Sequence, residues 1–392
     1  MKITLISNYL NHHQLPICLE MIKNGVDFRF VATEPVPENR LQLGYDDMNK
    51  KYDFVVRAYE DEDEAFQLGL NSDIVIIGSA DKKYIKERLK LKKMTFRYSE
   101  RIYKDGFNLK TWLSVLKNYA FFERNVYLLC ASAYTAYDYY LSFAYKNKTI
   151  KWGYFPEIYH IDINELMKCK QNNKKIEILW VGRFIDWKHP EKAILVAKRL
   201  KEDNYDFSLK MVGIGDQFDT IKKMIDDYKL NDYVKLTGSV NNKEVRKYMK
   251  QANIYLFTSD YNEGWGAVLN EAMNSGCAII GSQAIGSVPF LIKNNHNGFI
   301  YDNDNFEDLY DKVKTIIDDK KLAFNFGKKA YETVFETWNA KNAVSKFLEL
   351  VKKIEGKKDI NEKNGPCSIA KPISNKKMYN YLVRNKYDRK NY

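Results

Sequence analysis

Residues 254–281 read IYLFTSDYNEGWGAVLNEAMNSGCAIIG. The apolar run 254–258 predicts a buried strand, because short apolar runs bounded by turn residues are typical of strands in parallel sheets. Residues 267–275 predict a helix that ends at Gly276, a residue type that commonly follows the last helical turn. The apolar run 277–281 predicts the next strand. This order of strand, helix and strand is typical of a parallel sheet covered by helices.

The same alternation extends over the whole chain. Apolar runs that predict strands lie at residues 3–7, 28–33, 74–78, 126–131, 176–181, 208–212 and 234–237. Amphipathic runs that predict helices lie at residues 15–24, 82–93, 191–202, 218–228, 243–251 and 339–355. Strands that alternate with longer helices indicate βαβ units, so we expect an α/β fold with doubly wound sheets.

The chain of 392 residues and 46.1 kDa is longer than one hydrophobic core usually serves, so we expect two domains. We place the amino-terminal domain at residues 1–167 and the carboxyl-terminal domain at 176–338. The polar stretch KCKQNNKK, residues 168–175, is typical of a linker. After the second domain we expect a helix at 339–355 and a basic tail at 356–392. No internal sequence repeat relates the two halves, which would share architecture only.

The formal net charge is +12 and is concentrated in the tail, where ten Lys or Arg face three Asp or Glu over residues 356–392. Such a segment is either a solvated terminus or a surface that meets anionic lipid. Nucleic acid is a third class of partner for a basic protein, but we find no motif that reads RNA or DNA and expect none. The five cysteines are scattered, which predicts neither a disulfide framework nor a zinc site.

The first residues, MKITLISNYLNHHQ, lack the apolar core and cleavage site of a signal peptide. No apolar run approaches the roughly 18 residues needed to span a bilayer. We therefore expect a cytoplasmic protein, or one held peripherally on the inner face of the cell membrane. The basic segment 82–93 permits the second location. An apolar helical stripe also permits it, although such stripes more often face a core. The stripe is formed by Trp112, Leu113, Val115, Leu116, Tyr119 and Phe122.

Two glutamates, Glu263 and Glu271, stand eight residues apart, with Gly264 and Gly266 beside the first. Their loop follows a predicted strand, and open α/β sheets bind ligands at the carboxyl ends of strands. Glycines let backbone N–H groups approach a ligand, and a helix N-terminus favours phosphate. Eight helical residues separate two backbones by roughly 12 Å, whereas hydrolytic carboxylates stand about 5–9.5 Å apart. The pair therefore suits hydroxyl groups at two ends of a nucleotide sugar. The alternative is two exposed glutamates without a ligand.

A second motif, ILWVGRFIDWK at residues 178–188, leads a strand into Gly182 and then supplies Arg183 and Lys188. Two permanent cations at the carboxyl end of a strand can neutralise a diphosphate, the guanidinium through a planar fork and the ammonium as a point charge. No metal would then be needed. The glycine-rich turn GIGD at residues 213–216 follows the next strand. The alternative is that both cations lie on a solvated loop.

These residues resemble the retaining GT-B glycosyltransferases of family 4 in the carbohydrate-enzyme classification. The resemblance covers residues 176–340 and is carried by VGR with its following lysine, VGIGD, LTGSV, the two glutamates and GSVPFLIKNNHNGFIY. It implies two Rossmann-like domains that face a cleft, with the nucleotide on the carboxyl-terminal domain. It also implies that the last helix crosses back to the amino-terminal domain. Over residues 1–165 the resemblance is weak.

The resemblance implies roles for individual residues. Arg183 and Lys188 would hold the donor diphosphate, Glu263 would accept hydrogen bonds from sugar hydroxyls, and these three would be the catalytic residues. Glu271 would accept from the ribose hydroxyls. The other donor-binding positions would be Gly182, Gly213, Gly215, Gly264, Trp265, Gly266 and Ala267, with Val240 in the segment 238–240 that borders the base. In such enzymes a diphosphate oxygen takes the acceptor's proton on the face from which it departs, so the sugar configuration is retained.

The amino-terminal half departs from the family pattern. Its first loop is usually glycine-rich but reads SNYLNHHQ at residues 7–14. There His12 or His13 would contact donor or acceptor, unless both are surface histidines without a role. A histidine usual after a later strand is replaced near Glu100 and Arg101, which are further candidate contacts. Phe290 stands where an acidic residue usually follows the proline of GSVP.

The resemblance predicts a retaining glycosyltransferase that moves a sugar from a nucleoside-diphosphate sugar to a glycan or lipid-linked acceptor, in surface polysaccharide biosynthesis. It predicts no cofactor beyond the donor substrate and no metal. Two other enzyme classes share the fold, nucleotide-sugar epimerases and phosphorylases. A non-catalytic module that binds sugar nucleotides or polyanions is the alternative from a different class.

Overall fold

The computed structural model describes residues 1–38, 41, 46–104, 106–117, 125–173 and 175–384. The chain forms two compact units. The first contains Met1–Glu157 and Asn339–Ile373, and the second contains Ile158–Trp338 and the segment that begins at Ser374. The chain therefore passes between the units three times.

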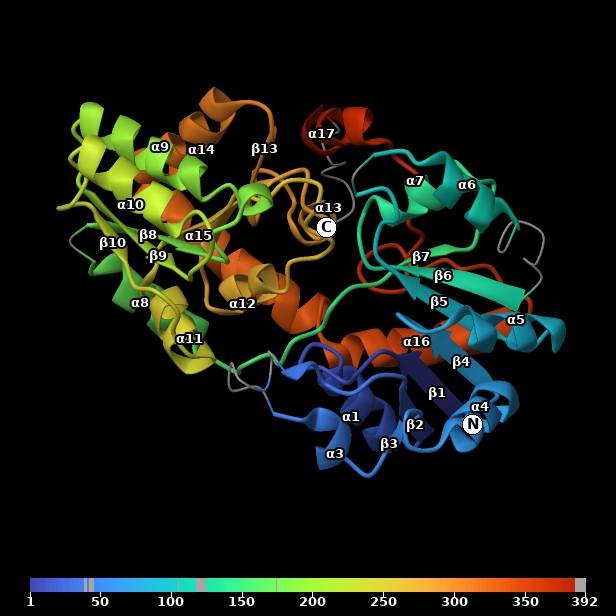
Figure 1. Ribbon diagram of the computed structural model, residues 1–392. Coiled ribbons are helices and arrows are strands. Elements are labelled where there is room, and N and C mark those ends of the chain that lie inside the picture. Colours follow the sequence, from blue (N-terminus) through green and yellow to red (C-terminus); the bar gives the residue numbers. More distant parts are fainter. Residues whose placement is uncertain (39–40, 42–45, 105, 118–124, 174, 385–392) are drawn as a thin grey trace. The chain divides into compact units, whose positions relative to one another are not determined.

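The first unit is built on a seven-stranded parallel sheet in the order β3-β2-β1-β4-β5-β6-β7 (Figure 1). Its strands are β1 (Lys2–Ser7), β2 (Asp27–Ala32), β3 (Val55–Arg57), β4 (Ile74–Ile77), β5 (Thr95–Ser99), β6 (Val126–Cys130) and β7 (Thr149–Lys151). Its helices are α1 (Leu15–Lys23), α3 (Met48–Lys51), α4 (Glu62–Asn71), α5 (Lys82–Lys90), α6 (Leu109–Val115), α7 (Thr135–Tyr140) and α16 (Ala340–Glu355). The strand order reverses between β1 and β4, which makes this the switch point of the sheet.

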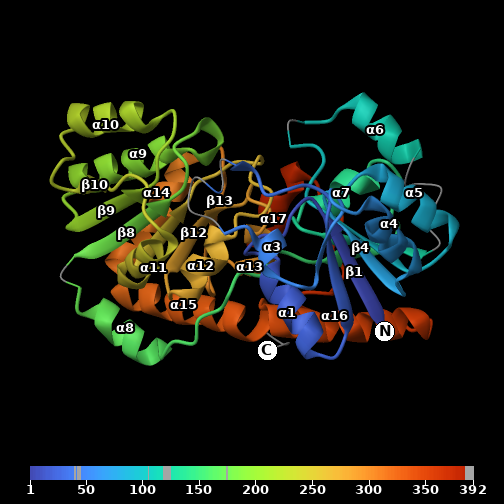
Figure 2. The same cartoon turned by 60° about the horizontal axis from the view of Figure 1, so that its bottom comes forward.

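Helix α16 belongs to the first unit because its apolar face is buried there. The ring of Phe347 lies 4.8 Å from the ring of Phe96 on β5 and 5.8 Å from that of Trp152, between centroids. Figure 2 shows α16 beside α1, against which it packs. Burial of this apolar stripe explains why a helix late in the sequence joins the first sheet.

The second unit is built on a six-stranded parallel sheet in the order β10-β9-β8-β11-β12-β13. Its strands are β8 (Ile176–Val181), β9 (Phe207–Val212), β10 (Val234–Leu236), β11 (Ile254–Phe257), β12 (Ala278–Ser282) and β13 (Gly298–Tyr301). Its helices are α8 (Ile163–Gln171), α9 (Pro190–Glu202), α10 (Phe218–Asp227), α11 (Asn242–Gln251), α12 (Val268–Asn274), α13 (Val288–Leu291), α14 (Phe306–Asp318), α15 (Lys320–Glu332) and α17 (Asn375–Arg384). Helices α9, α10 and α14 cover one face of the sheet, and α11, α12 and α15 cover the other (Figure 2). Two helix-covered parallel sheets confirm the predicted doubly wound architecture.

The prediction of a linker at residues 168–175 is wrong. Residues 163–171 form helix α8, and Lys170 is only 3% exposed. Its ammonium lies 2.6–3.3 Å from four backbone oxygens, those of Met249, Ala252, Ser275 and Gly276. These carbonyls end α11 and α12, so helix C-termini satisfy the buried charge. The first unit instead ends at Glu157.

The basic tail predicted at residues 356–392 is partly packed, so the alternative of a solvated terminus does not apply to that part. Ile369 pairs with Ile150 of β7 through an antiparallel bridge. Further on, the Tyr379 hydroxyl of α17 donates to Asp308 Oδ2 on α14 at 2.7 Å. Residues 385–392 lie outside the described residues.

Candidate functional site

The second sheet reverses its strand order between β8 and β11. The chain leaves β8 toward β9 on one side and leaves β11 toward β12 on the other. Loops that depart in opposite directions leave room for a ligand at the carboxyl ends of the two strands. Arg183 and Lys188 lie in the loop after β8, and Glu263 lies in the loop after β11. The fold thus brings together charged residues that are distant in sequence.

Three loops at this edge are joined by backbone hydrogen bonds. Phe184 N donates to Ile214 O, and Gly213 N donates to Gly238 O, both at 2.9 Å. The φ angle of Gly213 is +134°, and a Cβ at this position would lie 1.9 Å from Gly182 O. Glycine is therefore required because another backbone occupies the space of a side chain. The same holds for Gly215, whose Cβ would lie 2.4 Å from Phe184 O.

We expect Gly213→Ala to destabilise the second unit by about 3 kcal/mol, because it adds a steric clash to the cost of a left-handed backbone. Urea titration of the full chain measures the free energy of unfolding. Gly25→Ala is the control, since φ there is +75° and no atom lies within 4 Å of the new Cβ. The control should cost only about 1 kcal/mol. Equal losses in both variants would contradict the packing explanation.

Lys188 and Glu263 form an ion pair at the switch point. Their side chains are 13% and 10% exposed. The carboxylate also accepts a hydrogen bond from the Ser259 hydroxyl at 3.2 Å. Removing one partner of a buried ion pair strongly destabilises the folded protein, because the other charge then stays buried without compensation. The pair thus places an oriented carboxylate and a fixed ammonium at the same edge of the sheet.

The two predicted cations flank one aromatic ring. The Lys188 ammonium lies 4.5 Å from the centroid of the Trp187 ring, and the guanidinium carbon of Arg183 lies 5.8 Å from it. Cations over an indole face are attracted by the ring quadrupole. Arg183 is exposed and Lys188 is mostly buried, so the guanidinium is the more accessible of the two.

Thr258, which follows β11, fixes the backbone of Lys188 and was not predicted. Its hydroxyl accepts a hydrogen bond from Trp180 Nε1 at 2.9 Å and donates to Lys188 O at 2.7 Å. Asp260 N donates to Trp187 O at 3.0 Å. These bonds tie the loop after β8 to the loop after β11. A polar residue directly after an apolar strand is the only sequence signal for this role.

The indole of Trp265, in the loop from 264 to 267, is part of the core. Trp265 is buried, its Nε1 donates to Asn270 Oδ1 at 2.9 Å, and its ring lies 6.2 Å from that of Phe290 and 6.0 Å from that of Trp338. Phe290 therefore belongs to an aromatic cluster. Contact between a ligand and the main chain of this loop stays a prediction.

Gly266 lies between the buried residues Gly264 and Ala267. Its φ angle is +78°, and a Cβ there would lie 2.4 Å from the ring of Phe257. Its carbonyl accepts from Leu269 N at 2.9 Å, at the start of α12. The loop therefore packs directly on the end of β11 before the helix begins.

Glu271 lies in the first turn of α12 and faces Arg246 of α11. The closest nitrogen and oxygen of the two side chains are 3.7 Å apart, and the guanidinium donates to the backbone oxygen of Glu271 at 3.0 Å. Burial raises the pKa of the Glu271 carboxyl, and Arg246 opposes this shift. Arg246 was not predicted, because it lies on a neighbouring helix without a motif. Val240 lies partly exposed in the loop before α11.

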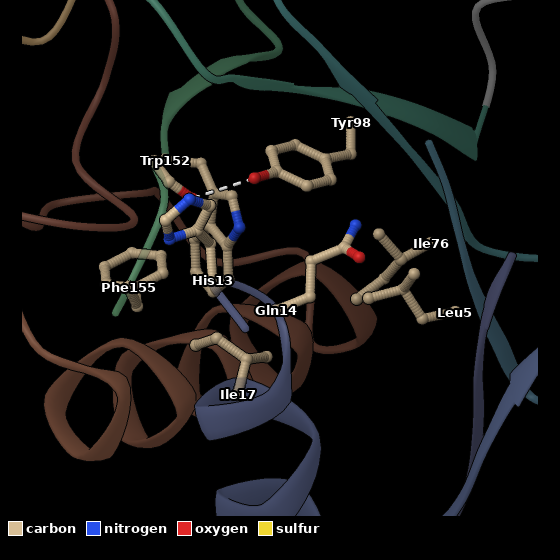
Figure 3. A pocket seen from close by; sticks show the side chains of 9 residues that line it. Leu5, His13, Gln14, Ile17, Ile76, Tyr98, Trp152 and Phe155 are labelled. Carbon is tan, nitrogen blue, oxygen red and sulfur yellow. Dashed lines mark hydrogen bonds between the residues drawn. The ribbon is translucent and has the colours of Figure 1, made fainter. Parts of the chain in front are cut away.

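The first sheet has its own switch point, between β1 and β4. The loop after β1 carries His12 and His13. Their ring centroids are 3.7 Å apart, and the ring of His13 stacks on that of Tyr154 at 5.8 Å. Figure 3 shows the residues around a pocket beside His13, which is lined also by Leu5, Gln14, Ile17, Ile76, Tyr98, Trp152, Gly153 and Phe155. The pocket has a volume of about 10 Å³. This is the volume that one water molecule needs, so the pocket cannot hold a sugar.

Arg101 forms a buried ion pair with Asp138, with a closest distance of 3.3 Å. The same carboxylate accepts hydrogen bonds from Ile102 N at 2.9 Å and Tyr103 N at 3.1 Å. Burial raises the pKa of Asp138, and Arg101 lowers it. These contacts favour a structural role for Arg101 over contact with a ligand.

Glu100 is more exposed than its neighbour. It accepts hydrogen bonds from the Lys104 ammonium at 2.6 Å and from the Tyr154 hydroxyl. Tyr154 in turn stacks on His13. Glu100 is thus linked to the loop after β1, where two of the predicted contacts lie.

The described residues contain no group of three or more His, Cys, Asp or Glu that could hold a metal ion. In the same part of the chain, no helix combines the length and apolar character needed to cross a membrane. Tyr119 and Phe122, which we included in the apolar stripe, lie outside the described residues.

Comparison with known proteins identifies the second unit. Residues 163–333 match the family model described as glycosyl transferases group 1. These residues belong to that family. The chain is 28% identical over 170 residues to the poly(ribitol-phosphate) alpha-N-acetylglucosaminyltransferase of Staphylococcus aureus strain COL, covering 43% of this chain and 34% of that protein. The chain spans about a third of the length of the curated relatives that it matches.

Two solved structures share the fold of this chain over most of its length. A glycosyltransferase from Rickettsia africae ESF-5 has a TM-score of 0.65 at 17% identity, covering 90% of this chain and 98% of that one. Anabaena Alr3699/HepE in complex with UDP has a TM-score of 0.68 at 13% identity, covering 90% of this chain and all of that one. At these identities the similarity establishes the fold alone, and the predicted GT-B fold is confirmed.

Proposed function

We propose that the protein is a retaining glycosyltransferase that moves a sugar from a nucleoside-diphosphate sugar to a glycan or lipid-linked acceptor, in surface polysaccharide biosynthesis. The observation that carries the proposal is the Lys188–Glu263 pair beside Arg183 at the switch point of the second sheet. The group 1 match supports it. The Staphylococcus aureus relative, by its name, supports a polymer acceptor, and the UDP bound to HepE supports a uridine nucleotide.

In the proposed reaction, the bond between the anomeric carbon and the diphosphate oxygen breaks while Arg183 and Lys188 neutralise the charge that develops on the leaving group. Glu263 accepts hydrogen bonds from sugar hydroxyls and aligns the ring. The acceptor hydroxyl forms the new bond on the same face, and its proton passes to the departing diphosphate. The sugar configuration is retained, and no side chain becomes covalently attached.

A screen across UDP, GDP and ADP sugars tests the function, with thermal shift as the readout of binding and nucleotide release as the readout of turnover. We expect one donor to raise the melting temperature and to release its nucleotide only when an acceptor glycan is present. Release without an acceptor would indicate an epimerase, and a requirement for phosphate would indicate a phosphorylase. Binding without any turnover would indicate a non-catalytic module.

Glu271→Ala should weaken binding of UDP about tenfold or more, because hydrogen bonds from ribose hydroxyls to a carboxylate are charge-assisted. Isothermal titration calorimetry measures the affinity. Burial raises the pKa of Glu271, so affinity should also fall as the pH is lowered and the carboxylate is protonated, and Glu271→Gln should show less of this dependence. The matched control is Glu202→Ala, which removes an exposed glutamate at the end of α9. An unchanged affinity of Glu271→Ala would contradict the ribose assignment.

A further inference from the structure

Five large apolar side chains are exposed around helices α6 and α7 of the first unit. They are 52–73% exposed and are Phe107, Leu109, Leu113, Tyr140 and Phe143. We call these five residues the α6–α7 apolar surface. Single exposed apolar residues are normal, whereas a contiguous group marks an interaction site.

Helix α6 lies against the end of α7. Trp112 Nε1 of α6 donates to Leu141 O, directly after α7, at 2.8 Å. Figure 1 shows the ribbons of α6 and α7. Leu109 and Leu113 are one helical turn apart, so they share a face of α6. The helix therefore presents two leucines beside the segment that carries Tyr140.

The residues before α6 reach the same segment. The ring of Tyr103 lies 5.4 Å from that of Phe107, and its hydroxyl lies 3.4 Å from Ser142 Oγ. Ser142 precedes Phe143. Phe107 therefore lies near the segment that carries Tyr140 and Phe143, as helix α6 does.

The backbone at Phe143 adds an independent observation. Its φ angle is +55°, and at 73% it is the most exposed large apolar side chain among the described residues. A bulky residue in the left-handed region is uncommon and costs conformational energy, whereas Asn and Gly suit it. Neither the local backbone nor the core explains phenylalanine here, so an external contact is the better explanation.

Exposed lysines lie in the segments that carry this surface. Lys110, Lys117 and Lys146 are exposed. Among the described residues from 101 to 148, the single carboxylate is that of Asp138, which is buried against Arg101. Two copies of such a surface would repel each other. An anionic bilayer matches it, because apolar side chains enter the headgroup boundary while ammonium groups meet lipid phosphates.

We propose that the α6–α7 apolar surface binds the surface of an anionic lipid bilayer. Binding to the bilayer needs neither donor nor acceptor, so this proposal goes beyond the proposed function and is tested separately from it. If the acceptor is lipid-linked, the same contact brings the first unit to the membrane that contains it.

Flotation of the full chain with vesicles tests the proposal, using phosphatidylcholine alone and phosphatidylcholine with phosphatidylglycerol, without donor. The wild-type chain should float with the anionic vesicles. The triple variant Leu109→Ser, Leu113→Ser, Phe143→Asn should reduce the vesicle-bound fraction about tenfold, because it removes most of the apolar contact. The matched control is Leu19→Ser, Ile22→Ser, which alters two exposed apolar residues of α1 and should bind like wild type.

The single variant Phe143→Asn keeps the test valid if the triple variant is unstable, because asparagine tolerates the positive φ angle. It should keep the wild-type melting temperature and lose part of the binding. The basic tail can bind the same lipids, so the deciding observation is the loss of the vesicle-bound fraction in the variants relative to the wild type. Equal binding of wild type and both variants would overturn the proposal, as would failure of the wild type to float. A change of oligomeric state without a change in flotation would assign the surface to self-association instead.

Discussion

Alanine in place of Lys188 or Arg183 should lower the turnover number about a hundredfold or more in each case, the usual scale for losing a preorganised charge stabiliser. Both cations are proposed to offset the charge that develops on the diphosphate. Lys188→Ala has a second effect, because it leaves the buried carboxylate of Glu263 without its cation. We therefore expect the larger loss at Lys188.

The measurement is nucleotide release at saturating donor and acceptor. Lys198→Ala is the matched control, since it removes a more exposed lysine of α9. The double variant Lys188→Ala, Glu263→Ala separates the two effects of Lys188. It should recover melting temperature, because the unpaired charge is gone, but it should not recover turnover. Near-normal turnover in both single variants would show that the cation assignment is wrong.

Lys170→Met should lower the free energy of unfolding by about 3 kcal/mol or more. The methionine fills similar space but leaves the carbonyls that end α11 and α12 without their common donor. Each buried, unsatisfied polar group costs about 1–3 kcal/mol. Because α12 carries Glu271, the variant should also bind UDP more weakly.

Urea titration measures the loss of stability at Lys170, and Lys168→Met is the matched control. Lys168 is exposed on the same helix, so its substitution should change stability by less than about 0.5 kcal/mol. If both variants unfold at the same urea concentration, the carbonyls do not depend on the Lys170 ammonium.

The strands of the second sheet were the most predictable part of the fold. The predicted strand 176–181 coincides with β8, and the predicted strand 254–258 extends β11 by one residue. Strands covered on both faces are continuous apolar runs, which the sequence displays directly. Strands β3, β7 and β13 were missed, and they have three, three and four residues. β5 reads TFRYS and was missed because polar residues interrupt it.

Helix α8 shows why local composition misleads. KCKQNNKK is as polar as a linker, yet Lys170 is buried because residues between 249 and 276 supply its hydrogen-bond acceptors. The candidate site likewise has features that the sequence predicts and one that it does not. The strand ends and glycine motifs predicted the loop positions of Arg183, Lys188 and Glu263. The Lys188–Glu263 pair joins residues 75 positions apart, and no local pattern encodes it.

A crystal structure with the intact nucleotide sugar bound tests the central claim most directly. We predict diphosphate oxygens about 2.7–3.2 Å from the side-chain nitrogens of Arg183 and Lys188. We also predict sugar hydroxyls at Glu263 and ribose hydroxyls at Glu271. A donor bound away from the switch point of the second sheet, or a bound donor that contacts neither glutamate, would contradict the claim.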